Sequence, residues 1–215
     1  MPPLPKEIRA RLASRGPRDH VRMLQRWHGT PFAAVEAHVP RAGTIVDAGC
    51  GFGMFAAVLA IGAPERRVVG LDLDGAKIAR ARELFGTFGT FVEGDLADAA
   101  LPPCRAVVLY DVLHHLRDPV VERVLAAAYD RVEPGGTLVV KENDVAPLWK
   151  RGISELVEAV AVGSGLTRSD PWRFRSRDAW VRVIEAAGFR VTLATALASP
   201  GYGRLLPHSL FVASR

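Results

Sequence analysis

The chain has 215 residues, of which 49% are hydrophobic and 24% charged, and its formal net charge at pH 7 is +5. This length and balance suit a globular α/β domain and exclude a largely disordered chain. Cys50 and Cys104 form neither a disulfide framework nor a metal-ligand pattern, so a reducing, cytoplasmic setting is expected. The N-terminal residues lack the apolar core of a secretory signal, and no apolar run approaches the roughly 18 residues that cross a bilayer.

Charge is distributed unevenly along the chain. Residues 1–43 carry a net charge of +5, residues 44–144 carry −5 and residues 145–215 carry +5. An acidic middle suits a cationic ligand, and basic ends suit an anionic molecule or surface. Arginines that only solvate helix faces would give the same pattern. Peripheral attachment at a membrane surface therefore stays open beside a freely dissolved cytoplasmic protein.

Hydrophobic periodicity predicts helices and strands that alternate along most of the chain. The predicted helices cover residues 5–15, 18–28, 30–38, 52–61, 74–85, 119–132, 148–162 and 177–187. The predicted strands cover residues 44–48, 66–73, 87–93, 106–110, 137–141, 190–195 and 209–213. This order predicts an α/β fold, a Rossmann-like, seven-stranded, mostly parallel sheet with helices on both faces and a small helical cap.

A glycine-rich turn, VDAGCGFGM (46–54), joins the first predicted strand to the next helix. Such turns let a backbone approach a nucleotide, and the register Gly51-x-Gly53-x-x-Ala56 with Asp72 about 20 residues on also fits a dinucleotide fingerprint. However, Asp47 precedes the glycines, and its carboxylate would repel a pyrophosphate by about 1–4 kcal/mol. An ammonium or a sulfonium would be attracted instead. The turn therefore favours a cationic cofactor without phosphate over NAD.

The segment VDAGCGFG resembles motif I of the class I S-adenosylmethionine-dependent methyltransferases. Four residues match its spaced positions: Asp47, Gly49, Gly51 and Gly53. Later segments resemble the family's further motifs: GLDLD (70–74), FVEGDL (91–96), VLYDVLHHL (108–116) and VEPGGTLVVKEN (132–143). The resemblance is dense over about residues 40–143. It implies the fold given above, with S-adenosylmethionine as cofactor and S-adenosylhomocysteine as product.

The same resemblance assigns roles to residues at the strand ends. Asp72 would accept hydrogen bonds from the ribose hydroxyls, and Leu73 would pack on the adenine. Asp95 would accept from the adenine amino group, and Leu96 would cover the ring. The residues expected to bind the cofactor are Asp47, Gly49, Cys50, Gly51, Gly53, Asp72, Leu73, Asp95, Leu96 and Asp111.

The division of the chain follows from the same comparison. We expect an N-terminal helical cap segment at residues 1–43 and an S-adenosylmethionine-binding core at residues 44–143. A cap insertion would follow at residues 144–175, and a C-terminal helix and strands at residues 176–215 would complete the sheet.

Two histidines, His114 and His115, follow the fourth predicted strand, near the expected position of the methyl group. Methyl transfer from a sulfonium is an in-line displacement in which the protein mainly aligns the reactants. A phenol, with a pKa near 10, also benefits from a neighbouring base. Either histidine is a candidate base, and a packing role is the alternative. The spacing of Asp111, His114 and His115 also resembles the metal-binding segment of ubiquinone-pathway O-methyltransferases, but His114 replaces their second acid, which argues against magnesium in particular. No metal is expected, although two histidines and one carboxylate are chemically able to bind one and this option stays open.

Motifs of enzymes that methylate amino groups of nucleic acid or protein, such as Asn/Asp-Pro-Pro-Tyr, are absent, so we expect a small-molecule acceptor and no nucleic acid. An oxygen of an aromatic, quinone-like, polyketide or lipid-like metabolite is the favoured target. Carbon or nitrogen methylation, a non-catalytic cofactor- or partner-binding module, and an NAD-dependent oxidoreductase stay open. The arginine-rich segment PWRFR (171–175) suits an anionic, carrier-bound or membrane-associated acceptor. Candidate acceptor-binding residues are Trp27, His28, Lys141, Glu142, Asn143, Trp149, Trp172, Arg173, Arg175, Tyr202 and His208.

Overall fold

The computed structural model describes residues 3–13, 16–98, 101–163 and 173–215. Its helices are α1 (Lys6–Ala13), α2 (Pro17–Gly29), α3 (Phe32–Glu36), α4 (Met54–Gly62), α5 (Gly75–Phe85), α6 (Asp118–Arg131), α7 (Leu148–Gly163) and α8 (Arg177–Ala186). Its strands are β1 (Gly43–Ala48), β2 (Arg66–Asp72), β3 (Thr90–Glu93), β4 (Cys104–Tyr110), β5 (Val132–Asn143), β6 (Arg190–Leu197) and β7 (His208–Ser214). Two short 3-10 helices follow β4 and β6, η1 (Leu113–His115) and η2 (Gly201–Leu205).

The helices and strands confirm the order of the predicted elements, although β3 begins three residues later than expected, at Thr90, and most other ends differ by up to two residues. Residues 14–15 of the first predicted helix lie outside the described residues, and three further differences are larger or were not predicted. The helix expected at residues 30–38 is limited to α3, because Pro31 precedes it and Pro40 follows it. Strand β5 begins five residues before the expected start, at Val132, and runs through the Pro-Gly-Gly segment. The two 3-10 helices were not predicted, because three to five residues are too few for a periodic pattern to emerge.

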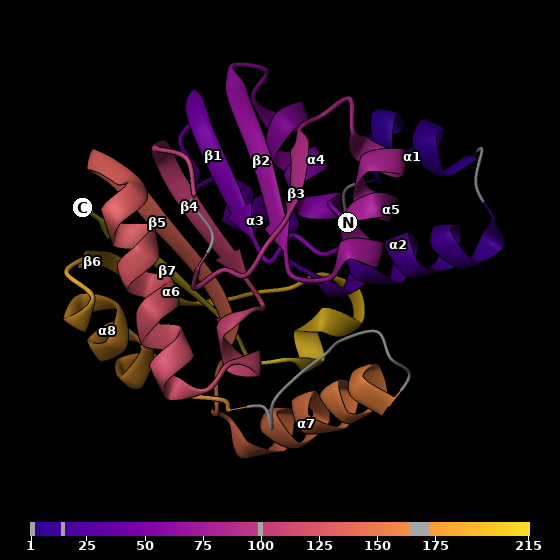
Figure 1. Cartoon of the computed structure of the whole chain (residues 1–215). Helices are drawn as coiled ribbons and strands as arrows, with labels where there is room; N and C mark the ends of the chain where they lie inside the picture. Colours follow the sequence, from indigo (N-terminus) through magenta and orange to yellow (C-terminus); the bar gives the residue numbers. More distant parts are fainter. Residues whose placement is uncertain (1–2, 14–15, 99–100, 164–172) are drawn as a thin grey trace.

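The seven strands form one sheet in the order β3-β2-β1-β4-β5-β7-β6 (Figure 1). Neighbouring strands are parallel from β3 through to β5, whereas β7 is antiparallel to both β5 and β6. The predicted Rossmann-like, mostly parallel sheet is therefore confirmed. The chain proceeds outward from β1 to β3 and then crosses back to β4 on the other side of β1. Ligands bind at the carboxyl edge beside such a reversal.

Successive side chains of the central strands pack alternately in two hydrophobic clusters. In β1, Ile45 packs with the cluster that includes helices α1–α5, and Val46 packs with the cluster that includes α6 and α8. The same alternation recurs in β4, where Val108 and Leu109 belong to opposite clusters. Because successive side chains of a strand point to opposite faces, this pattern gives a sheet covered on both sides. Figure 1 shows the two helical layers, with α7 apart from both at the end of the sheet.

The segment that follows α3 is held to the sheet by a buried arginine. Arg66, on β2, donates to the carbonyl oxygens of Pro40, Val39 and Leu59 at 2.7–2.8 Å and to the Glu36 carboxylate at 2.6 Å. Its side chain is fully buried, so these partners satisfy a charge that would otherwise be costly in the interior. This connection fixes where the N-terminal helices lie relative to the sheet.

Within the described part of the chain, no helix combines the length and the apolar character that a bilayer crossing requires.

Candidate functional site

A cavity of about 560 Å³ lies at the carboxyl edge of the sheet, within the range of about 300–1,000 Å³ usual for small-molecule sites. One half is lined by the glycine turn and by residues at or after the ends of β2 and β3. The other half is lined by residues of α2, α7, β5 and β7 and by Leu206, which follows η2. A single cavity thus joins two sets of residues that come from different parts of the chain.

Four backbone N–H groups of the glycine turn donate hydrogen bonds to other atoms of the protein. Gly49 and Cys50 both donate to the carbonyl oxygen of Leu71, at 2.7 and 2.9 Å. Gly51 donates to Asp72 Oδ2 at 2.8 Å, and Gly53 donates to the carbonyl oxygen of Cys50 at 2.9 Å. A phosphate cradle needs such N–H groups to point at the ligand. Because four of them are already engaged, the turn is suited to a ligand without phosphate.

Two glycines of the turn are required by close packing. A Cβ atom on Gly49 would lie 2.4 Å from a methyl group of Val112, and one on Gly53 would lie 2.6 Å from the ring of Phe91. Both residues also have positive φ angles, +85° and +77°. At Gly51, by contrast, a Cβ would meet nothing within 4 Å. Gly51 therefore faces the open cavity, whereas Gly53 is buried behind it and does not line it.

Asp72 lies at the end of β2 with its carboxylate anchored on both oxygens. Oδ2 accepts from Gly51 N and Oδ1 accepts from Asp74 N at 2.9 Å. The side chain lines the cavity, and each oxygen keeps a lone pair for a ligand. The next residue, Leu73, is 61% exposed and also lines the cavity. An exposed leucine beside a fixed carboxylate is suited to contact a ring next to a sugar.

Asp95 and Leu96 follow β3 and line the same half of the cavity. Asp95 Oδ1 accepts from Ala97 N at 2.9 Å, which orients the carboxylate, and Leu96 is half-buried beside it. Cys50 and Asp111 also line the cavity. The structure thus brings together eight of the ten residues predicted to bind the cofactor, and their binding role stays a prediction.

Asp47 is placed differently from the expectation of direct contact. It is 1% exposed, lies beneath the turn at the end of β1 and does not line the cavity. Ala56 N donates to its carboxylate, while Oδ2 has no partner among the described residues. Burial raises the pKa of Asp47 from 3.8 to about 7, partly offset by the nearby Arg26. A cation bound above the turn would offset the cost of ionising this buried group.

We expect Asp47→Asn to stabilise the protein increasingly as the pH rises from 4 to 8. Because the folded pKa is raised from 3.8 to about 7, the folded state keeps a proton that the unfolded chain loses in this window. The wild-type protein therefore loses stability as the pH rises from 4 to 7. Asparagine does not ionise and avoids this loss, which is on the order of 3–4 kcal/mol above pH 7. Urea unfolding at pH 4, 5.5, 7 and 8 measures the difference.

The matched control is Asp98→Asn, because the Asp98 side chain is 67% exposed and pairs with Arg123 only at the surface. The free energy of unfolding of this variant should follow that of the wild type across the same pH range. A constant difference between Asp47→Asn and the wild type would contradict the prediction.

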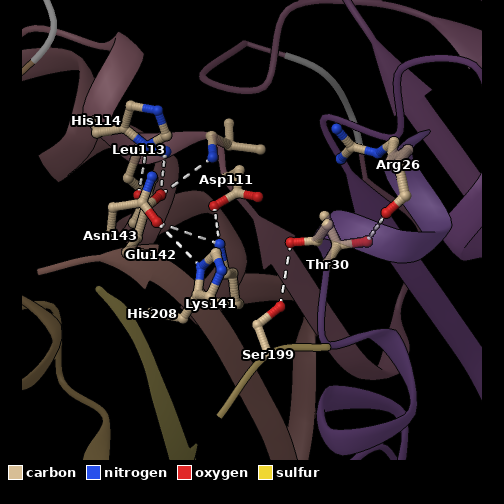
Figure 2. A network of polar contacts seen from close by, with 12 residues as sticks. Arg26, Thr30, Asp111, Leu113, His114, Lys141, Glu142, Asn143, Ser199 and His208 are labelled. Carbon is tan, nitrogen blue, oxygen red and sulfur yellow. Dashed lines mark hydrogen bonds and ion pairs between the residues drawn. The ribbon is translucent and has the colours of Figure 1, made fainter. Parts of the chain in front are cut away.

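A buried polar cluster connects the ends of β4 and β5 (Figure 2). Glu142 is fully buried, and its Oε1 accepts from Val112 N at 3.0 Å and Leu113 N at 2.7 Å. Its Oε2 lies 2.5 Å from His114 Nδ1. Lys141 is also fully buried and forms an ion pair with Asp111. Although desolvation opposes ionisation, the Lys141 ammonium and neighbouring charges hold the pKa of Asp111 at about 2.

The same cluster bears on the metal option. The structure groups Asp111, His114 and Glu142, with possible ligand atoms within 4.8 Å of one another. The third member of this group is therefore Glu142 and not His115. The Lys141 ammonium is paired with Asp111, and Glu142 is hydrogen-bonded to two backbone N–H groups and to His114. Hydrogen bonds and the Lys141 ammonium therefore already engage the side chains that a metal ion would need as ligands.

The two candidate catalytic histidines differ in burial and in access to the cavity. His114 is fully buried and does not line the cavity, whereas His115 is half-buried and does. Their ring centroids are 4.0 Å apart. Of the two, only His115 can reach a ligand in this cavity directly, and His114 is placed to orient the segment after β4.

Only some of the predicted acceptor-binding residues line the cavity. Asn143 and His208 line the cavity. Trp27 packs on Phe32 at 6.0 Å between ring centroids and contributes to a smaller pocket, and Trp149 is 58% exposed beside Lys150. His28 is half-buried outside the cavity lining.

The two arginines are engaged with the protein itself. Arg173 and Arg175 both donate to Asp118, at 3.3 and 2.8 Å, and neither lines the cavity. The sequence could not show this, because Asp118 lies more than 50 residues away. Tyr202 belongs to η2, and Trp172 lies outside the described residues.

Several lining residues were not predicted from the sequence. Met23, Arg26 and Thr30 follow one face of α2, and Ser154, Val157 and Val160 follow one face of α7. Their helical spacing was visible in the sequence, but the sequence does not say which face meets the sheet edge. Lys141 and Glu142 were predicted to lie at the acceptor pocket, and Lys141 lines the cavity whereas the fully buried Glu142 does not.

Comparison with known proteins agrees with this geometry. A family model described as a methyltransferase domain matches residues 45–136. An uncharacterised methyltransferase of Mycobacterium tuberculosis is 33% identical over 153 residues, which cover 69% of this chain and 75% of that protein. An uncharacterised protein of Synechococcus is 32% identical over 155 residues. The match covers 67% of this chain but only 36% of the Synechococcus protein, so the chain spans little more than a third of that relative.

Solved structures share the fold. A complex of the Haloferax volcanii Trm112 methyltransferase activator with a putative methyltransferase matches with a TM-score of 0.73 at 20% identity, over 96% of both chains. Human N-acetylserotonin methyltransferase, solved with S-adenosylmethionine, matches with a TM-score of 0.69 at 19% identity, over 100% of this chain and 60% of that chain. An O-methyltransferase family 2 protein of Planctomyces limnophilus, solved with apigenin, has a TM-score of 0.69 at 17% identity, over 97% and 64% of the chains.

Fold, cavity and sequence relatives together define an α/β methyltransferase. The chain belongs to the class I S-adenosylmethionine-dependent methyltransferase family, and its cofactor is S-adenosylmethionine. Three features of the cavity fit this molecule. The turn leaves few N–H groups for a phosphate, Asp72 offers an anchored carboxylate, and Asp47 beneath the turn, with one unpartnered oxygen, would favour a cation bound above the turn.

Proposed function

We propose that this protein transfers a methyl group to an oxygen of a small, ring-containing metabolite. The observation that carries the proposal is the single cavity, in which the glycine turn and Asp72 in one half adjoin Lys141, Asn143 and His208 in the other. Such an arrangement lets two small molecules meet without leaving the protein. Support for oxygen as the target comes from the Planctomyces limnophilus O-methyltransferase, whose structure contains apigenin.

Bound S-adenosylmethionine would supply a methyl group on a sulfonium. The residues of this chain would hold the cofactor with Asp72 and Asp95 and place Leu73 and Leu96 against its adenine. In the other half, Val157, Val160 and Leu206 line the cavity and would exclude water from the acceptor. Alignment and water exclusion are the main contributions that a protein makes to an in-line displacement.

Proton removal from the acceptor falls to His115 in this proposal. His115 lines the cavity and follows Asp111, whose carboxylate is ionised above its pKa of about 2. A phenol has a pKa near 10, so a neighbouring base would assist its deprotonation at neutral pH.

The test combines binding with turnover. Calorimetry with S-adenosylhomocysteine and with NAD should give binding of the first only. Incubation with methyl-labelled S-adenosylmethionine and a panel of phenols, carboxylic acids, amines and activated carbon acids should then give label in phenolic products. Binding of NAD alone would overturn the cofactor assignment. Label only in amine or carbon products would overturn oxygen as the target, and binding without transfer to any panel member would favour a non-catalytic module.

A further inference from the structure

The acceptor half of the cavity contains a chain of polar side chains that ends in one unsatisfied nitrogen. From Asp111 the chain runs through Lys141 and Asn143 to His208, and all four residues line the cavity (Figure 2). Lys141 Nζ is paired with Asp111 and lies 3.5 Å from Asn143 Oδ1. His208 Nδ1 lies 3.1 Å from the same oxygen.

This arrangement fixes the tautomer of His208. An amide oxygen only accepts hydrogen bonds, so Nδ1 must carry the hydrogen and donate it to Asn143 Oδ1. The other ring nitrogen, Nε2, then carries a lone pair. The fixed tautomer means that His208 presents an acceptor and not a donor.

The charge state of His208 is also set by its surroundings. Burial, and then the Lys141 ammonium, lower the pKa of His208 to about 3, although the Asp111 carboxylate opposes this shift. A hydrogen bond with the Gly203 backbone, in η2, raises the pKa of the ring, and the Lys150 ammonium of α7 lowers it. The imidazole is therefore neutral at physiological pH, and its Nε2 lone pair is available.

Apart from the contact of the ring with the Gly203 backbone, His208 Nε2 has no hydrogen-bond partner among the residues that the structure describes, although the side chain is only 3% exposed. A buried acceptor without a donor is costly, by about 1–3 kcal/mol, so such atoms usually mark a place where a partner arrives. A second atom of this kind lines the same cavity, the hydroxyl oxygen of Ser154 on α7. Two unsatisfied polar atoms in one cavity point to a ligand with polar groups of its own.

We propose that the acceptor donates a hydrogen bond, from a hydroxyl or an N–H group, to His208 Nε2, and that Asn143 positions His208 for this contact. The proposal rests on the proposed function and narrows its substrate class. The acceptor is a hydroxylated or N–H-bearing ring compound, and a purely apolar lipid or a fully O-methylated ring would leave Nε2 unsatisfied.

The test uses two probes that differ in one donor, 2-naphthol and 2-methoxynaphthalene, titrated into protein saturated with S-adenosylhomocysteine. The wild type should bind 2-naphthol at least about ten-fold more tightly than its methyl ether. His208→Phe keeps an aromatic ring without the acceptor, and its affinity ratio should fall to about one. His38→Phe is the matched control, because His38 is exposed and does not line the cavity, and it should keep the wild-type ratio. Ser154→Ala removes the other unsatisfied polar atom and tests whether that atom gives the discrimination instead.

A second measurement covers the case in which His208→Phe does not fold. In wild-type protein labelled with ¹⁵N-histidine, the His208 Nε2 resonance should have the shift of an unprotonated nitrogen at pH 7. Addition of 2-naphthol, and not of the methyl ether, should move it. No binding of 2-naphthol, an unchanged ratio in a folded His208→Phe variant, a ratio lost in Ser154→Ala instead, or a protonated Nε2 would each overturn the proposal.

These outcomes are separable from a failure of the proposed function. S-adenosylhomocysteine binding is measured first, and its loss would count against the function itself. Preserved cofactor binding together with equal affinities for the two probes would remove only the role of His208. If the cofactor does not bind, the same comparison of probes in its absence still decides what the cavity recognises.

Discussion

Replacement of Asp72 by alanine should weaken S-adenosylhomocysteine binding by about 100-fold or more. In our proposal, the carboxylate would accept two hydrogen bonds from the ribose, and each bond to a charged group contributes about 1.5–3 kcal/mol. The variant also leaves Gly51 N and Asp74 N without their acceptor, so the turn loses its anchor. Loss of two such bonds corresponds to about 3 kcal/mol, which is roughly a 100-fold change in the dissociation constant. Isothermal titration calorimetry measures it.

Asp98→Ala is the control for this experiment, because it removes an aspartate that lies at the surface and does not line the cavity. Its affinity should equal that of the wild type. Asp72→Asn separates shape from charge, since an amide has one acceptor oxygen where the carboxylate has two, and it should also bind weakly. Wild-type affinity in a folded Asp72→Ala variant would remove Asp72 from the cofactor site.

Replacement of Glu142 by alanine should lower the free energy of unfolding by about 3–5 kcal/mol, the usual cost of breaking a buried charged network. Three donors, Val112 N, Leu113 N and the ring of His114, contact its carboxylate in the interior. In a domain of this size, the loss corresponds to a fall in Tm of roughly 10 °C. Urea unfolding and thermal melting measure the two quantities.

Glu155→Ala provides a contrast, because Glu155 forms a partly exposed pair with Arg151 along one helix and should cost less than about 0.5 kcal/mol. Glu142→Gln keeps the size of the side chain and one acceptor oxygen, so its loss should be intermediate. Equal stability of the Glu142→Ala and Glu155→Ala variants would show that the buried cluster does not organise the segment after β4.

The cofactor half of the site was largely predictable because its residues follow strands directly. Asp72, Asp95 and Asp111 each lie at or just beyond a strand end, and the carboxyl ends of parallel strands meet at one edge. A correct assignment of strands therefore brings these side chains together without further information. The position of Asp47 was not predictable in this way, because an acidic residue near a strand end can line the cavity or, as here, be buried beneath the turn.

The acceptor half was harder to predict because it depends on distant partners. Trp149 was expected in the pocket, but α7 turns it outward and presents Ser154 instead. Arg173 and Arg175 were expected to bind an anionic acceptor, but in the structure both form ion pairs with Asp118 and neither lines the cavity. In each case the residue type was suggestive, and the deciding factor was a contact between segments far apart in the chain.

The reversed direction of β7 has a consequence for how this protein could diversify. Asn143, the last residue of β5, pairs with His208, the first residue of β7, so the edge receives the end of one strand and the beginning of the other. Acceptor contacts are thereby encoded after residue 140, apart from those of α2 and the turn after β4, while the predicted cofactor contacts lie in residues 47–111. Recombination near residue 131, before β5, between related genes would exchange much of the proposed acceptor site together and preserve the predicted methyl donor site. Chimaeras joined there offer a direct route to new acceptors.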